Sequence, residues 1–339
     1  MEKILMGKNG RDLILKWKNR IMKIRITAPA HLHAGNMDLN GSMGRLYGTV
    51  GFAVENPRVV IEIEKSESVE ANDPVAERFA KTVANSFGFG GFRVTVKERF
   101  PEYTGLGYLT TLGISVGIGA ARLHGINCSA EEIALKIRRG LVTALGLYAC
   151  KLGGFIVEGG FRKGMVERSV PPLIFRGEIP ENWIFVIAVP EAPRRRIAEL
   201  RIRSEERILL QEVSMNAEDA SYLSRLVLMK MIPSFVERDL AAFGEAITEF
   251  NRRLGFIWER YQKGLYCDPL VERGIEIMLE HAYGACQSSW GPAFYAITDS
   301  EDKARRLADK IRDFLSFHGG GDVFVTRGNN RGLEVVELG

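Results

Sequence analysis

The chain has 339 residues, which is enough for two domains of ordinary size. Its composition, 46% hydrophobic and 26% charged, is that of a globular protein, and no run approaches the ~20 consecutive apolar residues needed to cross a bilayer. The net charge of +4 suits anionic small molecules but is too small and too dispersed to indicate nucleic-acid binding. We therefore expect neither a membrane nor a nucleic-acid partner.

The four cysteines argue against a structural metal. Cys128, Cys150, Cys267 and Cys286 lack the short CxxC-type spacing of zinc sites, so no zinc is expected. Cys150 and Cys286 have apolar neighbours in the sequence, which predicts buried thiols. Free thiols are typical of a reducing compartment, and the cytoplasm is the expected location.

The chain begins with a segment, residues 1–21, that mixes basic residues with short apolar pairs and lacks the core of a signal peptide. One interpretation is a loosely attached extension, with Met22 as the natural first residue. The alternative is a docked strand over residues 12–17.

Residues 23–98 show the patterns of strands and one helix. Between the first two strands, a loop rich in glycine, asparagine and histidine is expected at residues 30–48, and a turn at Pro57 is expected to separate the next two. The helix is expected to end at Gly88. In chain order, the expected elements are strands at 23–27, 49–54 and 58–65, a helix at 74–86 and a strand at 92–98.

A glycine-containing segment, residues 101–111, follows the last of these strands and leads into a small-residue helix predicted over residues 110–124. A strand, a glycine turn and a helix start direct backbone N–H groups and the positive end of the helix at one anion. Here the expected contacts come from Gly105, Leu106, Gly107, Thr110 and Thr111, the glycines allowing close approach and the threonines adding hydroxyl donors. The expected ligand is a phosphorylated small molecule. The spacing matches neither a P-loop nor GxGxxG, and an ordinary turn is the alternative.

The rest of the chain is predicted to add a helical segment and then a second unit. A capping box at Ser129 opens a helix over residues 130–139, and a short strand covers residues 154–157. We place the domain boundary near Pro180, which gives domains at residues 22–180 and 181–339. Amphipathic spacing and capping residues then predict a strand at 183–189, helices near 240–254, from Asp268 to Gly284 and from Ser300, and strands at 293–298, 322–327 and 333–338. Because strands and helices do not alternate regularly, the expected fold class is α+β.

A second candidate site lies in the expected loop at residues 30–48, where His31, His33, Asp38 and Arg45 occur close together. The two histidines are two positions apart, so in an extended segment they share a face. This group suits anion binding and acid–base chemistry better than zinc binding. The alternative is an ordinary surface loop.

Two further segments carry weaker signals. Ser288 and Ser289 lie in a small-residue connection that would touch a ligand or support the glycine segment from behind, with a plain helix–strand turn as the alternative. An arginine-rich run at residues 194–207 is interleaved with glutamates. We interpret it as a solvated, salt-bridged helix face, with a mobile phosphate lid as the alternative.

The order and spacing of the three glycine-containing segments resemble the three motifs of the GHMP kinase superfamily. The resemblance is closest to one branch, the β-ribofuranosylaminobenzene 5′-phosphate synthases, and runs from Lys23 to the C-terminus. It rests on residues 25–33, 38–41, 44–45, 48–51, 101–102, 105–107, 139–140, 153–160, 171–172 and 288–292.

The resemblance implies a two-domain GHMP kinase-like fold, with an N-terminal domain like domain 2 of ribosomal protein S5 and a ferredoxin-like C-terminal domain. It implies a pentosyltransferase of archaeal methanopterin biosynthesis. In that reaction phosphoribosyl pyrophosphate gives ribose 5-phosphate to a 4-substituted benzoate, with loss of carbon dioxide and pyrophosphate. The family also implies a homodimer and assistance by Mg²⁺.

The resemblance suggests roles for the candidate residues. The segment from Gly105 to Thr111 would hold a phosphate or the pyrophosphate. Asp38 would bind Mg²⁺ or stabilise the cationic sugar, and His31 or His33 would contact the leaving group or the ring substituent. A phosphate or the benzoate carboxylate would be bound by Arg45 and Arg139.

Several segments depart from the family pattern, which makes the chain a divergent member. Bulky Tyr108 and Leu109 follow Gly107 where the family continues with small residues, and the first motif reads His-Leu-His rather than Arg-Leu-His. Two alternatives stay open. An ATP-dependent GHMP small-molecule kinase would lack both the lysine of the first motif and the aspartate base. A non-catalytic ligand-binding paralogue would fit the bulky residues at 108 and 109.

Overall fold

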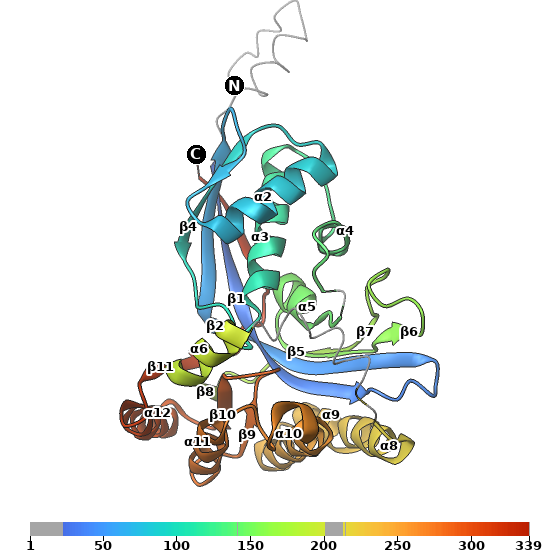
Figure 1. The fold of residues 1–339 in the computed structure, drawn as a ribbon, viewed down its shortest axis with the longest axis vertical. Helices are drawn as coiled ribbons and strands as arrows, with labels where there is room; N and C mark the ends of the chain where they lie inside the picture. Colours follow the sequence, from blue (N-terminus) through green and yellow to red (C-terminus); the bar gives the residue numbers. More distant parts are fainter. Residues whose placement is uncertain (1–22, 141, 201–212, 214, 339) are drawn as a thin grey trace, which may run out of the picture.

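The computed structural model describes residues 23–140, 142–200, 213 and 215–338. Two β-sheets organise this part of the chain, and helices cover one face of each (Figure 1). The predictions for residues 1–21, including the strand at 12–17, lie outside the described residues.

The first sheet is built on a long antiparallel pair, β1 (Lys23–Asp38) and β2 (Arg45–Lys65). Its strand order is β12-β1-β2-β4-β3, and β5 and β6 pair with a further part of β2, while β7 pairs with β5. The shorter strands are β3 (Glu70–Ala71), β4 (Phe92–Glu98), β5 (Phe155–Glu158), β6 (Phe161–Arg162), β7 (Leu173–Gly177) and β12 (Glu334–Leu338).

The prediction of a loop at residues 30–48 is wrong for most of its length. β1 continues to Asp38, with His31 paired to Ala53 and His33 to Gly51 on β2. Three polar residues of this segment, His31, His33 and Asn36, line a cavity, so their polarity reflects a polar site and not the end of the strand. Likewise, Pro57 does not divide β2. The register passes from Pro29↔Arg58 to Ala30↔Val54, so the residues between form a bulge, where proline is tolerated.

Four helices cover one face of the first sheet: α2 (Pro74–Phe87), α3 (Tyr108–Leu123), α4 (Ala130–Lys136) and α5 (Leu145–Leu152) (Figure 1). The predicted end of α2 is confirmed, because Gly88 closes it in the left-handed region, and the structure adds an N-cap at Asp73, which accepts from the N–H groups of Val75 and Ala76. The capping box at Ser129 is also present. The small residues of α3 bring it close to the sheet, since a Cβ on Gly119 would lie 2.4 Å from Ile63.

The second sheet is antiparallel throughout and has the order β11-β8-β10-β9, which is the 4-1-3-2 order of a ferredoxin-like unit. Its strands are β8 (Ile184–Pro190), β9 (Gly284–Gln287), β10 (Phe294–Thr298) and β11 (Gly321–Arg327). The predicted α+β fold class with a ferredoxin-like second unit is therefore confirmed.

Helices form the lower layer of the molecule in Figure 1. They are α8 (Ala217–Leu226), the π-helical turn η1 (Val227–Met231), α9 (Ile232–Glu237), α10 (Leu240–Gln262), α11 (Pro269–Leu279) and α12 (Glu301–Ser316). Helix α6 (Glu191–Leu200) lies above this layer, beside β8 and β11 (Figure 1). The caps at Asp268 and Ser300 are as predicted. Gly284 does not end α11 but begins β9.

The last strand corrects the predicted organisation of the second unit. β12 was expected to complete that unit, yet it pairs with β1 at the edge of the first sheet (Figure 1). The chain therefore crosses between the sheets twice, once after β7 and once after β11. The two crossings are joined, because Asn330 exchanges hydrogen bonds with the backbone of Ile179, and Arg176 donates to the Asn330 carbonyl.

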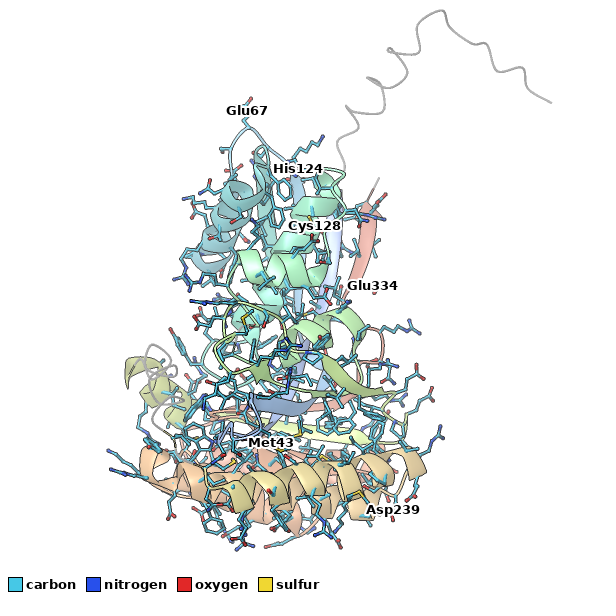
Figure 2. All side chains as sticks on the ribbon, turned by 90° about the vertical axis from the view of Figure 1, so that its right-hand side faces the viewer. Met43, Glu67, His124, Cys128, Asp239 and Glu334 are labelled. Atoms are coloured by element: carbon cyan, nitrogen blue, oxygen red, sulfur yellow. The ribbon has the colours of Figure 1, made fainter. Side chains whose placement is uncertain are left out.

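Aromatic side chains fill the space between the two sheets. Phe52 of β2 lies 5.2 Å from both Phe155 and Phe185, measured between ring centroids, and 6.2 Å from Tyr295 of β10. Beyond this core, the hairpin of β1 and β2 extends over the lower helices, and Figure 2 shows Met43 at its tip beside them. Hydrogen bonds from Leu39 and Asn40 to Met215 hold the hairpin there.

Candidate active site between the two sheets

A cavity of about 390 Å³ lies where the first sheet, the start of α3 and the second unit meet. The seven predicted site residues that line it are His31, His33, Gly105, Gly107, Thr110, Arg139 and Ser289. Most of the remaining wall was not predicted from the sequence, and it includes Asn36, Thr143, Glu167, Asn251, Trp258, Gln262, Tyr266, Gln287 and Trp290.

The two glycines of the 101–111 segment allow protein groups to approach one another closely. Both have positive φ, +86° at Gly105 and +81° at Gly107. A Cβ on Gly105 would lie 2.3 Å from the Ser288 carbonyl oxygen, and one on Gly107 would lie 1.8 Å from Cε1 of His31. Glycine is therefore required here to seat the start of α3 against the histidine and the β9–β10 connection.

The start of α3 forms the anion-binding end of the cavity. Gly107 is the N-cap residue, and Thr110, one turn into the helix, lines the cavity. Arg139 donates to the Thr110 hydroxyl over 3.4 Å, which places a guanidinium beside the positive end of the helix. Thr111 does not contribute, because its hydroxyl donates to the Pro29 carbonyl, and Leu106 is part of the core.

Tyr108 neither blocks the cavity nor lines it. Its side chain is 2% exposed and packs edge-on against Phe100, with ring centroids 5.4 Å apart. The first residue of α3 is thus directed into the core of the first unit. The bulky residue that separates this chain from the family motif leaves the cavity open, which removes the main argument for a non-catalytic paralogue.

The two histidines lie side by side on β1 and both face the cavity, as their spacing predicts. Each is 7% exposed. The backbone N–H of His31 donates to the Leu106 carbonyl, which holds β1 against the glycine segment. Burial lowers the pKa of His33 to about 4, so this imidazole is neutral at pH 7.

Ser288 holds the histidine strand and the glycine segment together. Its buried hydroxyl accepts from the His33 backbone N–H over 3.0 Å and donates to the Gly105 carbonyl over 2.9 Å. The next residue, Ser289, donates its backbone N–H to the His33 carbonyl and lines the cavity. Of the two predicted serine roles, Ser288 supports the glycine segment and Ser289 reaches the cavity.

Asp38 and Arg45 correct the predicted site. Asp38 accepts the backbone N–H groups of Asn40 and Gly41 at the turn of the β1–β2 hairpin. The Arg45 guanidinium donates to two backbone carbonyls, those of Gly159 and Gly160. Both side chains stabilise local backbone, and neither lines the cavity. Polar residues close in sequence were separated here because β1 carries them along the sheet.

Asn251 of α10 connects the two units at the cavity wall. Its amide group donates to the Ala34 carbonyl of β1 and the Gln287 carbonyl of β9, and its oxygen accepts from the Gln287 N–H. The sequence signal that could have identified it is a polar residue on the inner face of the amphipathic helix, between Phe250 and Leu254.

The arginine-rich run lies away from the cavity as far as it is described. Arg194 and Arg195 pair with Glu191 on the same helix, and Arg196 pairs with Asp268. This part is the ion-paired helix face that was predicted. Residues 201–207 of the run lie outside the described residues.

The described part of the chain contains neither a metal-binding cluster nor a membrane-spanning helix. Residues 23–140 and 142–338, apart from the gaps given above, hold no group of three or more His, Cys, Asp or Glu side chains arranged to bind a metal ion. The carboxylate on the cavity wall is Glu167, which lies 3.7 Å from the Arg138 guanidinium.

In the described part of the chain, we find no helix with the length and apolar character needed to span a membrane. All four cysteines are free, and Cys150 and Cys286 are buried as predicted.

Comparison with solved structures defines the class of protein. The chain superposes on a homoserine kinase from Cytophaga hutchinsonii with a TM-score of 0.67 at 16% identity, covering 99% of this chain and 100% of that one. It also superposes on the mevalonate kinase of Methanococcus jannaschii with a TM-score of 0.62 at 14% identity, covering 90% and 98%. A family model described as "GHMP kinases C terminal" matches residues 231–316. The fold is that of the GHMP kinases.

Comparison with curated sequences identifies the branch. The β-ribofuranosylphenol 5′-phosphate synthase of Methanothermobacter thermautotrophicus is 31% identical over 94% of this chain and 100% of its own length. The enzyme of the same name from Archaeoglobus fulgidus is 31% identical over 92% and 99%. The chain belongs to the β-ribofuranosylphenol 5′-phosphate synthase family.

Proposed function

We propose that this protein is a β-ribofuranosylphenol 5′-phosphate synthase, a pentosyltransferase of methanopterin biosynthesis. It would join ribose 5-phosphate from phosphoribosyl pyrophosphate to a 4-substituted benzoate, releasing carbon dioxide and pyrophosphate. The observation that supports this most directly is the cavity at the start of α3. It combines an anion-binding helix end and Arg139 with two buried histidines and an aromatic wall, in a chain that matches the family over its length.

The proposed chemistry uses these groups in distinct ways. When the bond from the sugar C1 to the pyrophosphate oxygen breaks, the electron pair leaves with the oxygen and the sugar becomes oxocarbenium-like. Preorganised donors at the start of α3 and on Arg139 stabilise the departing charge. The ring carbon that carries the carboxylate then bonds to the sugar, and the electrons of the carboxylate bond return to the ring as carbon dioxide leaves. No net proton transfer is needed, which suits a neutral His33.

The residues present are compatible with Mg²⁺. This ion keeps several waters and is commonly bound through substrate phosphates and one or two carboxylates. Glu167 would be the protein carboxylate, and the Thr110 hydroxyl lines the same cavity. Bound there with the pyrophosphate, Mg²⁺ would neutralise negative charge on the leaving group.

The assembly and location are proposed on the same basis. We propose a cytoplasmic homodimer that acts on phosphorylated small molecules and binds neither nucleic acid nor membrane. The free cysteines support a reducing compartment, and the modest net charge argues against a nucleic-acid partner. The homodimer is proposed from the family resemblance alone.

The test is to follow release of labelled carbon dioxide. The protein is incubated with Mg²⁺, phosphoribosyl pyrophosphate and carboxyl-labelled 4-hydroxybenzoate, with 4-aminobenzoate in a parallel reaction. We expect gas release that depends on the sugar donor and yields one pyrophosphate per carbon dioxide. Folded protein that gives no release above background with either acid would reject the proposed function. Replacing the donor with ATP is the control for kinase activity, and no phosphorylated product is expected.

A further inference from the structure

The wall of the cavity changes character from one end to the other. The order of its parts follows from contacts. Gly107 and Thr110, at the start of α3, are in contact with or directly beside the His31 ring. His33 follows along β1, and its carbonyl accepts the N–H of Ser289. Trp290 is the next residue. Two residues beyond His33 on β1, Gly35 lies against Leu254, which is one turn before Trp258 on α10. Along β1, the histidines therefore lie between the helix end and the Trp258 side of the cavity.

Aromatic and apolar side chains form the far end. Trp258 of α10 and Trp290 have ring centroids 4.5 Å apart at an angle of 68°. Trp258 is 9% exposed, and Leu254, Leu265 and Tyr266 line the same end. Such a wall offers ring faces and edges to a planar ligand, whereas the α3 end offers N–H groups and a guanidinium.

We infer that the benzenoid acid binds against Trp258 and Trp290, and that the phosphorylated sugar binds at the α3 end, so that the reacting carbons meet beside His31 and His33. This inference rests on the proposed function, because it assigns the two substrates of that reaction to opposite ends of one cavity. Trp258 and Trp290 are then specificity-determining residues for the aromatic acceptor.

The arrangement also orients the acceptor. The ring carbon that bears the carboxylate must reach the sugar, so the carboxylate faces the histidines and the 4-substituent lies deeper among the aromatic residues. As carbon dioxide forms, the negative charge leaves the carboxylate.

The experiment compares the Michaelis constants of the two substrates in matched variants. Trp258→Leu and Trp290→Leu are expected to raise KM for 4-hydroxybenzoate about tenfold each, which corresponds to roughly 1.4 kcal/mol, while KM for phosphoribosyl pyrophosphate changes less than twofold. Trp290→Phe keeps a ring and is expected to recover most of the acceptor affinity. Phe256→Leu is the control, since Phe256 lies on the same helix but is 53% exposed. Arg139→Ala is expected to show the reverse pattern, with the donor KM raised.

The outcomes separate the two proposals. A wild-type protein that releases no carbon dioxide rejects the proposed function. A wild-type protein that does release it, with tryptophan variants that keep the acceptor KM or raise both constants equally, rejects only the assignment of the acceptor end. Thermal unfolding of each variant confirms that it is folded. If Trp258→Leu does not fold, the acceptor KM of Trp290→Leu and Trp290→Phe provides the test, because Trp290 is only half-buried.

Discussion

Two parts of the first sheet treat a buried carboxylate in opposite ways: the outer half around residues 23–27 of β1, and the inner half where β2 pairs with β5. In the outer half, Glu62 of β2 lies 2.8 Å from Lys23 and 2.7 Å from Arg25, and these partners hold its pKa down to about 2. In the inner half, Glu158 is fully buried on β5 opposite Thr49, and burial raises its pKa to about 7. Its Oε2 accepts a hydrogen bond from the Gly160 N–H. The nearby Arg45 guanidinium donates to the backbone carbonyls of Gly159 and Gly160 and not to this carboxylate.

The difference shows what each half is built for. The outer half faces solvent and satisfies its carboxylate with charged partners, which contributes to stability. The inner half borders the cavity and relies on uncharged hydrogen bonds, as at Asn36, which lines the cavity and donates to Thr49. A site that must bind an anionic substrate has few permanent negative charges beside it. Because the two carboxylates have different surroundings, substitutions in the two halves are expected to have different effects on activity and stability.

The largest effect is expected from Gly107→Ala in the inner half. The new Cβ would occupy the position of the His31 ring at a residue with φ of +81°, so the ring and the start of α3 must move apart. A displacement of about 1 Å in a positioned site lowers the rate about 100-fold. The measurement is kcat for carbon dioxide release. Gly88→Ala is the control, with a similar positive φ and open space around the new Cβ, and activity close to wild type is expected. Equal loss in both variants would contradict the structural argument.

The next effect concerns Glu158→Gln. The folded carboxyl keeps its proton up to about pH 7, whereas the unfolded one releases it near 4.5. The wild-type free energy of unfolding therefore falls as the pH rises from 4.5 through 7, by up to about 3 kcal/mol. Glutamine does not titrate, so this decline should disappear. Urea unfolding at pH 4.5, 6 and 8 measures it, and an unchanged slope in the variant would show that another group is responsible.

Glu62→Gln should give a smaller effect with the opposite sign. Because the folded pKa of Glu62 is near 2, the wild type gains stability as the pH rises from 2 to about 4.5 and keeps it above that range. The variant should lack this gain and be about 1 kcal/mol less stable at pH 7, because Lys23 and Arg25 are themselves partly exposed. Acid unfolding monitored by circular dichroism provides the measurement. If the wild type and the Glu62→Gln variant unfold at the same acid midpoint, Glu62 does not contribute to this pH dependence.

The smallest effect is expected from Asp38→Asn. Asparagine retains an oxygen that can accept from Asn40 and Gly41, so the hairpin turn is preserved. Because Asp38 does not line the cavity, kcat should change by less than about threefold, the limit set by small shifts in position. A loss of 100-fold would return Asp38 to the catalytic residues.

The sequence predicted those parts of the fold that depend on local signals. The caps at Ser129, Asp268 and Ser300 and the amphipathic pattern of α10 are read from neighbouring residues, and all are present. The pairing of β12 with β1 was missed because it depends on contacts between opposite ends of the chain, which no local pattern records.

The site divides in the same way. The glycine segment and the histidine pair have local signatures and do meet at the cavity. Asp38 and Arg45 have the right chemistry, but the direction of β1 carries them elsewhere. Trp258 and Asn251 look like ordinary positions on an amphipathic helix. Only the packing of α10 against β1 and β9 shows that they face the cavity.

The double crossing between the sheets, joined through Asn330 and Ile179, determines how the two halves of the enzyme can move. A single connection would let one half rotate about several axes relative to the other. Two adjacent, cross-linked connections leave mainly a swing about the line through them. Because the shared aromatic core and the hydrogen bonds of Ser288 and Asn251 oppose a wide swing, admission of substrates and discharge of products are expected to use a small swing of this kind, together with local shifts of the loops at the cavity mouth.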